Sequence, residues 1–92
     1  QQVNVEAVLA ARLHLGEMLN WGHGVQKDFN KAYSYFVEVA NQQDNKWARA
    51  GACLYLGEMY YYGNGVAKDF NKTLEYFEHV TNQQDNVWAQ IG

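Results

Sequence analysis

The feature that most constrains this fold is an internal repeat with a fixed offset of 41 residues. The segment Lys-Asp-Phe-Asn-Lys at residues 27–31 returns at 68–72, and Asn-Gln-Gln-Asp-Asn at 41–45 returns at 82–86. A fixed period of about 20 to 50 residues is typical of solenoids, whose units bury their apolar faces against one another. The repeat therefore predicts a stack of similar units.

The boundaries of these units follow from the offset. We place the first unit at about 5–43, the second at about 44–84 and the start of a third at 85–92, all within one domain spanning 1–92. Stacked units generally need about three repeats to be stable alone. The apolar end faces of a shorter stack could be covered by further repeats, by end-to-end self-association or by domain swapping.

Each unit contains two helical patterns. Asp28 and Asp69 are suited to cap the N-terminus of a helix. Apolar residues then follow at the spacing of one helical face, and they are Phe29, Ala32, Tyr33, Phe36 and Ala40 in the first unit and Phe70, Leu74 and Phe77 in the second. The stretch at about 45–61 is apolar on several faces and rich in small residues, as a helix packed between two others would be.

Glycine-rich segments at 22–25 and 63–66 separate the two helices of each unit and suit a tight connection. No long alternating pattern bounded by hairpin signals indicates a strand. We therefore predict an all-α fold, an α/α solenoid of antiparallel helix pairs.

The second unit carries a specific resemblance. Residues 52–60 read Ala-Cys-Leu-Tyr-Leu-Gly-Glu-Met-Tyr, and Gly-Asn-Gly-Val follows at 63–66, with Asp69, Lys72 and Tyr76-Phe77 further on. This pattern resembles the Sel1-like repeat of the tetratricopeptide-like class. The resemblance implies a superhelical adaptor or scaffold that binds a protein or peptide, in a family with many exported bacterial members. The 41-residue period exceeds the common unit, so we expect the surplus near 43–47 to lengthen the first helix or the loop before it.

The resemblance also implies a binding surface. In this class the first helix of each pair lines the concave face, and similarity places Gly16 and Gly57 at its small packing position. The residues expected to face a partner are Glu17, Asn20 and Trp21 in the first unit and Glu58, Tyr61 and Tyr62 in the second. Aromatic contact and pairing with Lys or Arg would bind a peptide there. The alternatives are that Trp21 and Tyr62 only pack the turn and that both glutamates lie on a solvated face.

Two other functions remain open from the sequence. Glu17 and Glu58 could act in a hydrolase, or in a binder of a small cell-envelope molecule, because paired carboxylates can perform acid–base chemistry. They repeat with the unit, however, which favours a structural role, and we predict no catalytic residue and no enzyme. The third reading is a structural spacer in a longer array.

Composition excludes several further classes. Seven Lys and Arg against ten Asp and Glu give a net charge of −3, which provides no basic field for nucleic acid. Apolar runs are far shorter than the roughly 20 residues of a membrane span, so we predict no membrane insertion. No metal motif or cofactor-binding motif is present. The compartment stays open between the cytoplasm and an exported or periplasmic location.

Trp47 and Trp88 occupy equivalent positions just after the Asn-Gln-Gln-Asp-Asn segment. We predict that both indoles are buried and hold this segment against the preceding helix. Cys53 aligns with Arg12 and has no sequence-visible base, so we expect a small helix residue rather than a nucleophile.

Overall fold

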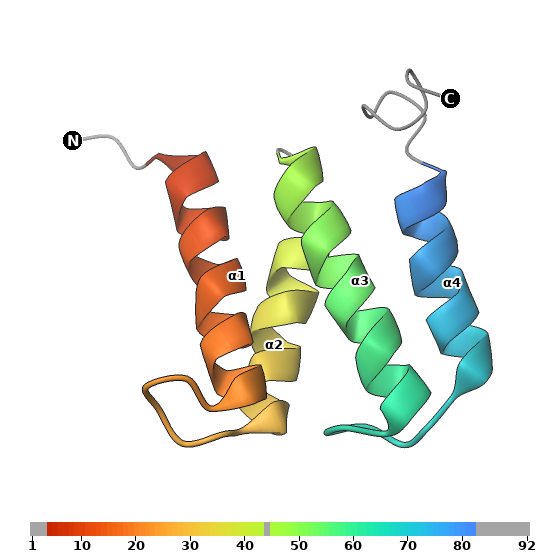
Figure 1. Cartoon of the computed structure of the whole chain (residues 1–92). Helices are drawn as coiled ribbons and strands as arrows, with labels where there is room; N and C mark the ends of the chain where they lie inside the picture. Colours follow the sequence, from red (N-terminus) through yellow and green to blue (C-terminus); the bar gives the residue numbers. More distant parts are fainter. Residues whose placement is uncertain (1–3, 44, 83–92) are drawn as a thin grey trace.

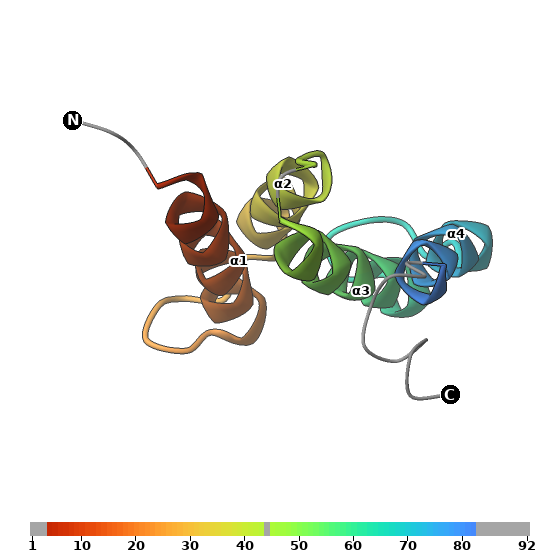
Figure 2. The ribbon, with the colours of Figure 1, turned by 90° about the horizontal axis from the view of Figure 1, so that it is seen from above.

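The computed structural model describes residues 4–43 and 45–82, in which four α-helices form two antiparallel pairs (Figure 1). The helices are α1 (Val5–Trp21), α2 (Phe29–Ala40), α3 (Lys46–Tyr62) and α4 (Phe70–Thr81). Each helix packs against the next one in the sequence, and α1 also contacts α3 (Figure 2). Within the described residues there is no strand, so the predicted all-α helical-repeat fold is confirmed.

Local capping explains where the helices begin. The Asp28 carboxylate accepts a hydrogen bond from the Lys31 backbone N–H at 3.1 Å, and Asp69 does the same for Lys72 at 3.2 Å. Each bond satisfies one of the backbone donors that a helix leaves unpaired in its first turn. The predicted N-caps of α2 and α4 are therefore present in both units.

The first helix of each pair ends at a glycine. Gly22 and Gly63 have φ angles of 71° and 74°, in the left-handed region that side chains disfavour. Their backbone N–H groups bond to the carbonyls of Met18 and Met59, at 2.7 and 2.8 Å. This αL termination stops the helix and turns the chain back toward its partner helix.

A second glycine in each first helix sets how closely the pair packs. A Cβ atom on Gly16 would lie 2.5 Å from the Phe36 ring, and one on Gly57 would lie 2.5 Å from the Phe77 ring. The absence of a side chain thus lets an aromatic ring of the second helix lie directly on the backbone of the first. The predicted small packing position is confirmed in both units.

The buried core runs through the junction of the two pairs. Its members are Leu9, Ala32, Phe36, Val39, Ala48, Ala52, Leu56 and Met59. Half of them lie on α3, because α3 packs against a helix of its own pair and against the preceding pair. In α4 the predicted apolar stripe is only partly buried: Phe77 is half-buried, but Phe70 and Leu74 are exposed.

The prediction for Trp47 is wrong, because its side chain is 70% exposed. Asn45 caps α3 by accepting a hydrogen bond from the Ala48 N–H at 3.1 Å, so Trp47 lies in the first turn of the helix. The next residue, Ala48, is the one that enters the core, and one position corresponds to about 100° around a helix. Trp88 lies outside the described residues.

The surplus of the long repeat is divided between a loop and a helix. Gln43 and Asn45 lie in the connection between α2 and α3, whereas Lys46 and Trp47 form the start of α3. Gln43 also accepts a hydrogen bond from the Arg49 guanidinium at 2.5 Å, which ties this connection to α3.

Candidate functional site

The six residues expected to face a partner lie on the two first helices. Glu17, Asn20 and Trp21 belong to the last turns of α1, and the equivalent residues Glu58, Tyr61 and Tyr62 belong to the last turns of α3. Because α1 and α3 are in contact, residues of the two units can meet across this junction.

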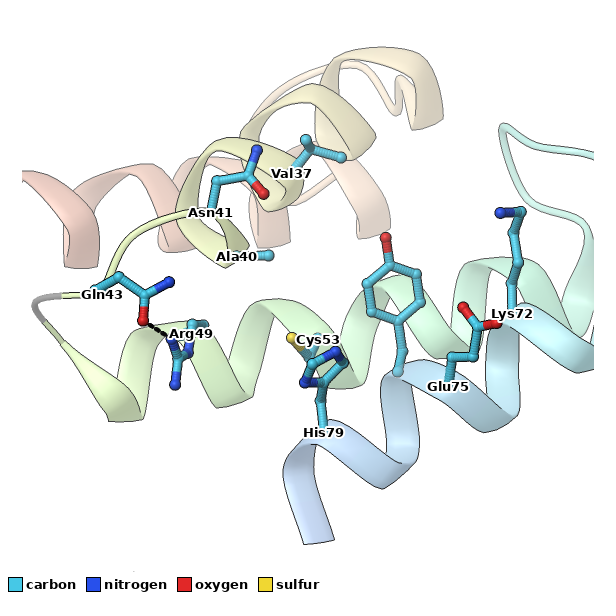
Figure 3. Close-up of a pocket in the computed structure, with 10 residues that line it drawn as sticks. Val37, Ala40, Asn41, Gln43, Arg49, Cys53, Lys72, Glu75 and His79 are labelled. Carbon is cyan, nitrogen blue, oxygen red and sulfur yellow. Dashed lines mark hydrogen bonds between the residues drawn. The ribbon is translucent and has the colours of Figure 1, made fainter. Parts of the chain in front are cut away.

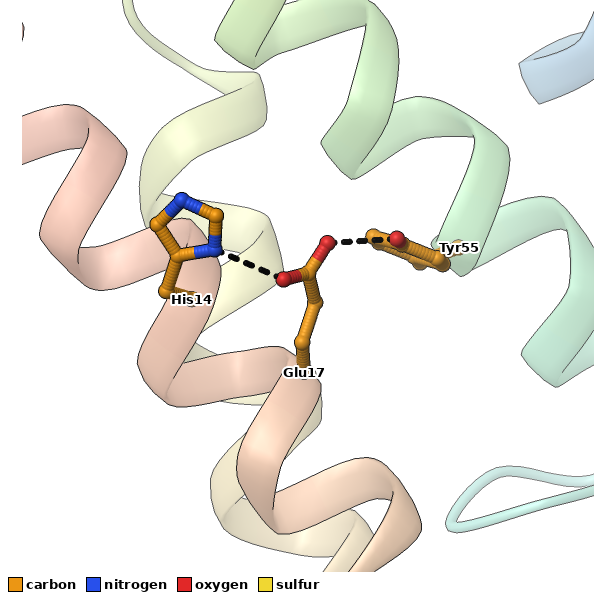
Figure 4. A network of polar contacts seen from close by, with 3 residues as sticks. All are labelled: His14, Glu17 and Tyr55. Carbon is orange, nitrogen blue, oxygen red and sulfur yellow. Dashed lines mark hydrogen bonds and ion pairs between the residues drawn. The ribbon is translucent and has the colours of Figure 1, made fainter. Parts of the chain in front are cut away.

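Glu17 connects the two units. One of its carboxylate oxygens accepts a hydrogen bond from the Tyr55 hydroxyl of α3 at 2.5 Å, and the other lies 2.8 Å from Nδ1 of His14 (Figure 4). The Glu17 side chain is only 27% exposed. It is therefore a partly buried, hydrogen-bonded group between first helices and not an isolated surface charge.

Tyr55 is the centre of the junction. Its ring meets the Trp21 indole edge to face at a centroid distance of 5.3 Å, and it stacks on Phe36 at 4.9 Å. Burial raises the pKa of Tyr55, and the hydrogen bond to Glu17 and the charges of Glu17 and Glu58 raise it further. Both glutamates thus act electrostatically on one phenol, although they belong to different units.

Glu58 differs from its equivalent Glu17. It is half-buried, and burial raises the pKa of its carboxyl group. Among residues 4–43 and 45–82 no hydrogen bond or ion pair is made by its side chain, whereas Glu17 has two partners. The carboxylate of Glu58 is therefore partly desolvated, and none of the described residues compensates its charge.

Exposed aromatic rings flank these carboxylates. Trp21 is nearly half exposed and stacks loosely on His23, with ring centroids 6.4 Å apart. Tyr62 lies one helical turn beyond Glu58 and is largely exposed. Trp21 also packs on Tyr55 of the second unit, so it contacts more than the turn that follows α1.

The remaining two predicted residues are more involved in packing. The Tyr61 ring contacts Tyr62 at 4.9 Å and Phe70, at the start of α4, at 5.4 Å. The Asn20 side-chain oxygen is buried and has no hydrogen-bond partner within the described part of the chain. These two residues border the exposed acidic and aromatic groups.

Sequence reasoning missed three residues: Tyr55, His14, which bonds to Glu17, and His23, which stacks on Trp21. The repeat alignment pairs Tyr55 with His14, and each stands three positions before the glutamate of its unit. The recurrence of a polar aromatic residue at this position is the sequence signal that could have identified them. His23 is equivalent to Asn64 and carried no such signal. The pairing across units could not be found from the sequence because it depends on how α1 and α3 pack.

A separate hollow of about 450 Å³ lies between α2, α3 and α4 (Figure 3). Its lining residues are Val37, Ala40, Asn41, Gln43, Arg49, Cys53, Lys72, Glu75, Tyr76 and His79. None of the six predicted site residues is among them. Burial raises the pKa of the Cys53 thiol, opposed in part by Arg49, which is the environment of an unreactive buried cysteine.

The described residues form neither a metal-binding cluster nor a membrane-spanning helix. No three His, Cys, Asp or Glu side chains in residues 4–43 and 45–82 gather closely enough to hold a metal ion. None of the four helices in that part of the chain combines the length and apolar character that crossing a bilayer requires.

Comparison with known proteins supplies a family. A family model described as the Sel1 repeat matches residues 9–44 and again residues 50–78. The two matches cover most of the two helix pairs. A search of curated proteins finds no match.

Proposed function

The chain belongs to the Sel1 repeat family, whose repeats are generally protein-interaction modules, and we propose that its first helices bind a basic segment of a partner protein. The family is typically one of adaptors without enzymatic activity. The proposed surface, called here the acidic aromatic face, consists of Glu17, Asn20, Trp21, Glu58, Tyr61 and Tyr62.

The observation that carries the proposal is the half-buried carboxylate of Glu58, which has no hydrogen-bond or ion-pair partner in the described part of the chain. A carboxylate that is partly removed from water without a counter-charge is held at a cost in free energy. A Lys or Arg side chain from a partner would supply that counter-charge. Binding should therefore lower the pKa of Glu58 toward its ordinary value or below it.

The surrounding aromatic groups supply the second part of the recognition. Trp21 and Tyr62 present exposed ring surface, against which the aliphatic stem or the cationic end of a Lys or Arg can pack. Aromatic residues contribute disproportionately to binding energy at protein interfaces. A peptide with basic residues beside apolar ones matches this combination better than an acidic peptide does.

A direct test is titration of the isotopically labelled chain with extended peptides of equal length that are basic, neutral or acidic, followed by two-dimensional NMR. We expect the basic peptides to shift resonances in the last turns of α1 and α3. Glu58→Gln should weaken that binding by about tenfold, as loss of one well-placed charge pair would. Binding should also weaken as ionic strength rises.

The matched control is Glu75→Gln, which makes the same change of net charge at an exposed position of α4. It should leave the affinity unchanged. Equal weakening by both variants would indicate attraction by net charge alone, and the absence of basic-peptide binding would refute the proposal. A pull-down from cell extract with a Trp21, Glu58, Tyr61 and Tyr62 quadruple variant as the control then identifies the natural partner.

A further inference from the structure

The same four residues form a stripe on both first helices, but they are buried on only one of them. Ala7, Ala11, Leu15 and Met18 of α1 are repeated as Ala48, Ala52, Leu56 and Met59 of α3. Leu15 is 42% exposed and Met18 37%, whereas Leu56 is 0% and Met59 2% exposed. Both alanines of α1 are exposed as well, and both alanines of α3 are buried. Identical side chains thus have opposite environments.

The preceding helix pair accounts for this difference. Both first helices pack against their own second helix through the same glycine contact, Gly16 with Phe36 and Gly57 with Phe77. That contact leaves the stripe of α1 exposed, so it cannot be what buries the stripe of α3. What α3 has in addition is the packing of α1 and α2 against it. The stripe is therefore an acceptor face for a preceding unit.

The complementary donor face is visible on α2. Phe29 lies against the turn of the second unit, where a Cβ atom on Gly65 would come within 2.8 Å of it. Tyr33 meets Tyr60 of α3, with their hydroxyls 2.9 Å apart. These two side chains, one helical turn apart, connect the first pair to the second.

The equivalent donor positions on α4 carry Phe70 and Leu74, which are 60% and 58% exposed. The equivalent acceptor positions in the first unit are Gly24 and Leu19. Around Gly24 there is room, because the nearest outside atom to a Cβ atom there is Met18 Cε at 3.7 Å. One end of the molecule therefore presents the apolar residues that the other end is shaped to receive.

We propose that the chain self-associates head to tail, with the α4 face of one copy packed on the α1 face of the next. The partner is thus a second copy of this chain, and the contact reproduces the packing of α2 on α3 within each copy. Leu15 and Leu74 do not belong to the acidic aromatic face, but Glu58 is common to both proposals. The Glu17–Tyr55 bond of the internal junction, repeated between copies, would place Glu58 beside His14 of the next copy. Peptide binding and self-association would therefore compete for Glu58, and variants of Leu15 and Leu74, which leave Glu58 unchanged, distinguish the two.

Charge supports the same pairing. In the internal junction Val37 of α2 and Cys53 of α3 line one hollow. At the equivalent positions of the proposed contact the chain has Glu78 on α4 and Arg12 on α1. A neutral pair is thus replaced by two opposite charges. Glu78 is exposed, and Arg12 is partly exposed and lies 3.9 Å from the Glu38 carboxylate of its own chain, which it would share with Glu78 of the next copy. Opposite charges facing each other favour this register over others.

A head-to-tail contact joins two different surfaces, so each added copy leaves a free face at both ends. The expected product is an open series of dimers, trimers and longer stacks that extends the superhelix. A closed symmetric dimer is not expected from this geometry.

The test uses sedimentation velocity of the full chain over a range of concentrations. The unmodified chain should form progressively larger species as its concentration rises. Leu15→Glu blocks the acceptor face and Leu74→Glu blocks the donor face, and each variant alone should associate at least roughly 30-fold more weakly, since each buries a charge at the centre of an apolar contact. Helical circular dichroism verifies that both variants fold.

Mixing the two variants gives the decisive result. The intact α4 face of the Leu15→Glu chain can still pack on the intact α1 face of the Leu74→Glu chain. The mixture should therefore form heterodimers and nothing larger. Trp47→Glu, a charge placed on an exposed aromatic position outside both faces, is the matched control and should associate like the unmodified chain.

Two outcomes would overturn the proposal. One is an unmodified chain that remains monomeric at every concentration measured. The other is a folded pair of variants that fails to form heterodimers on mixing. As a further check of register, Glu78→Arg should weaken association, and adding Arg12→Glu in the same chain should restore it.

Discussion

The first and second helix pairs have matching helix lengths, 17 residues for α1 and α3 and 12 for α2 and α4, yet they bury their equivalent residues differently. Leu15 is exposed where Leu56 is fully buried, and Phe36 is fully buried where Phe77 is only half-buried. The inner helices α2 and α3 contribute most of the core, whereas α1 and α4 each leave one apolar side open.

This difference shows that the position of a residue within one helical repeat does not by itself determine how deeply its side chain is buried. The helix, its cap and its glycine contact are formed within one unit, but the depth at which a side chain is buried depends on whether a neighbouring unit packs against it. Comparing equivalent residues in the two pairs therefore isolates the effect of a neighbouring unit on side-chain burial and stability.

The largest contrast is expected between Phe36→Ala and Phe77→Ala. Removing a fully buried phenylalanine costs about 3–5 kcal/mol of unfolding free energy through lost burial and the cavity left behind. The half-buried Phe77 should cost roughly half as much. Urea titration followed by circular dichroism measures both values, and equal losses would show that burial does not distinguish the two pairs.

The next contrast compares one residue type at one repeat position. Leu56→Ala should lower the unfolding free energy by about 2–5 kcal/mol, and Leu15→Ala by less than about 1 kcal/mol, because only Leu56 is enclosed. The measurement is thermal unfolding at a protein concentration low enough to keep the chain monomeric. A large loss at Leu15 under those conditions would contradict the assignment of its face as open.

The two equivalent glutamates should respond in opposite directions at pH 7. Glu17→Gln removes the negative charge from the group that accepts the Tyr55 hydrogen bond, and the weaker bond should lower stability by about 1 kcal/mol. Glu58→Gln removes an unpaired, partly buried charge and should raise stability. Changes of the same sign in both variants would show that the two carboxylates are not in different environments.

The pH dependence of the Glu58 effect has a definite sign. Its folded pKa is raised by burial, so its contribution favours folding fully below the unfolded pKa, about 4.3, and is lost as pH rises through the folded value. The increase in unfolding free energy caused by Glu58→Gln should therefore be present at pH 7 and absent near pH 3. Denaturation midpoints at the two pH values give the comparison.

The smallest effect is expected at Thr73, where the first unit has Ala32. The Thr73 hydroxyl lies within hydrogen-bonding distance of the Gly57 carbonyl, at 2.9 Å, and of the Asp69 carbonyl, at 3.2 Å. Thr73→Ala loses about 1 kcal/mol of hydrogen bonding but gains about half of that in helix propensity. A net loss under about 1 kcal/mol by urea titration is expected, and a larger one would show that the hydroxyl holds α4 on α3.

Much of the fold could be predicted because its signals are local. Asp28 and Asp69 cap their helices as their side chains suggest, and the stretch predicted at about 45–61 is the helix Lys46–Tyr62. Gly16 and Gly57 receive an aromatic ring, as their place in the repeat indicates. Each of these features depends on residues in the same unit.

The candidate site was only partly predictable. The sequence identified Glu17 and Glu58 as equivalent positions but could not distinguish them, because Tyr55, which bonds to Glu17, reaches it from the next unit. Trp47 was wrongly expected to be buried because composition does not fix which side of a helix faces the core when several sides are apolar.

The sequence by itself therefore determined the 41-residue repeat, the helix pairs, their caps and the close contact within each pair. Only the tertiary structure decided which of two identical stripes is buried, which glutamate is paired and which aromatic rings are exposed. The physical reason is range: capping and helical periodicity act over one or two turns, whereas burial and side-chain pairing require a second unit at the right distance and rotation.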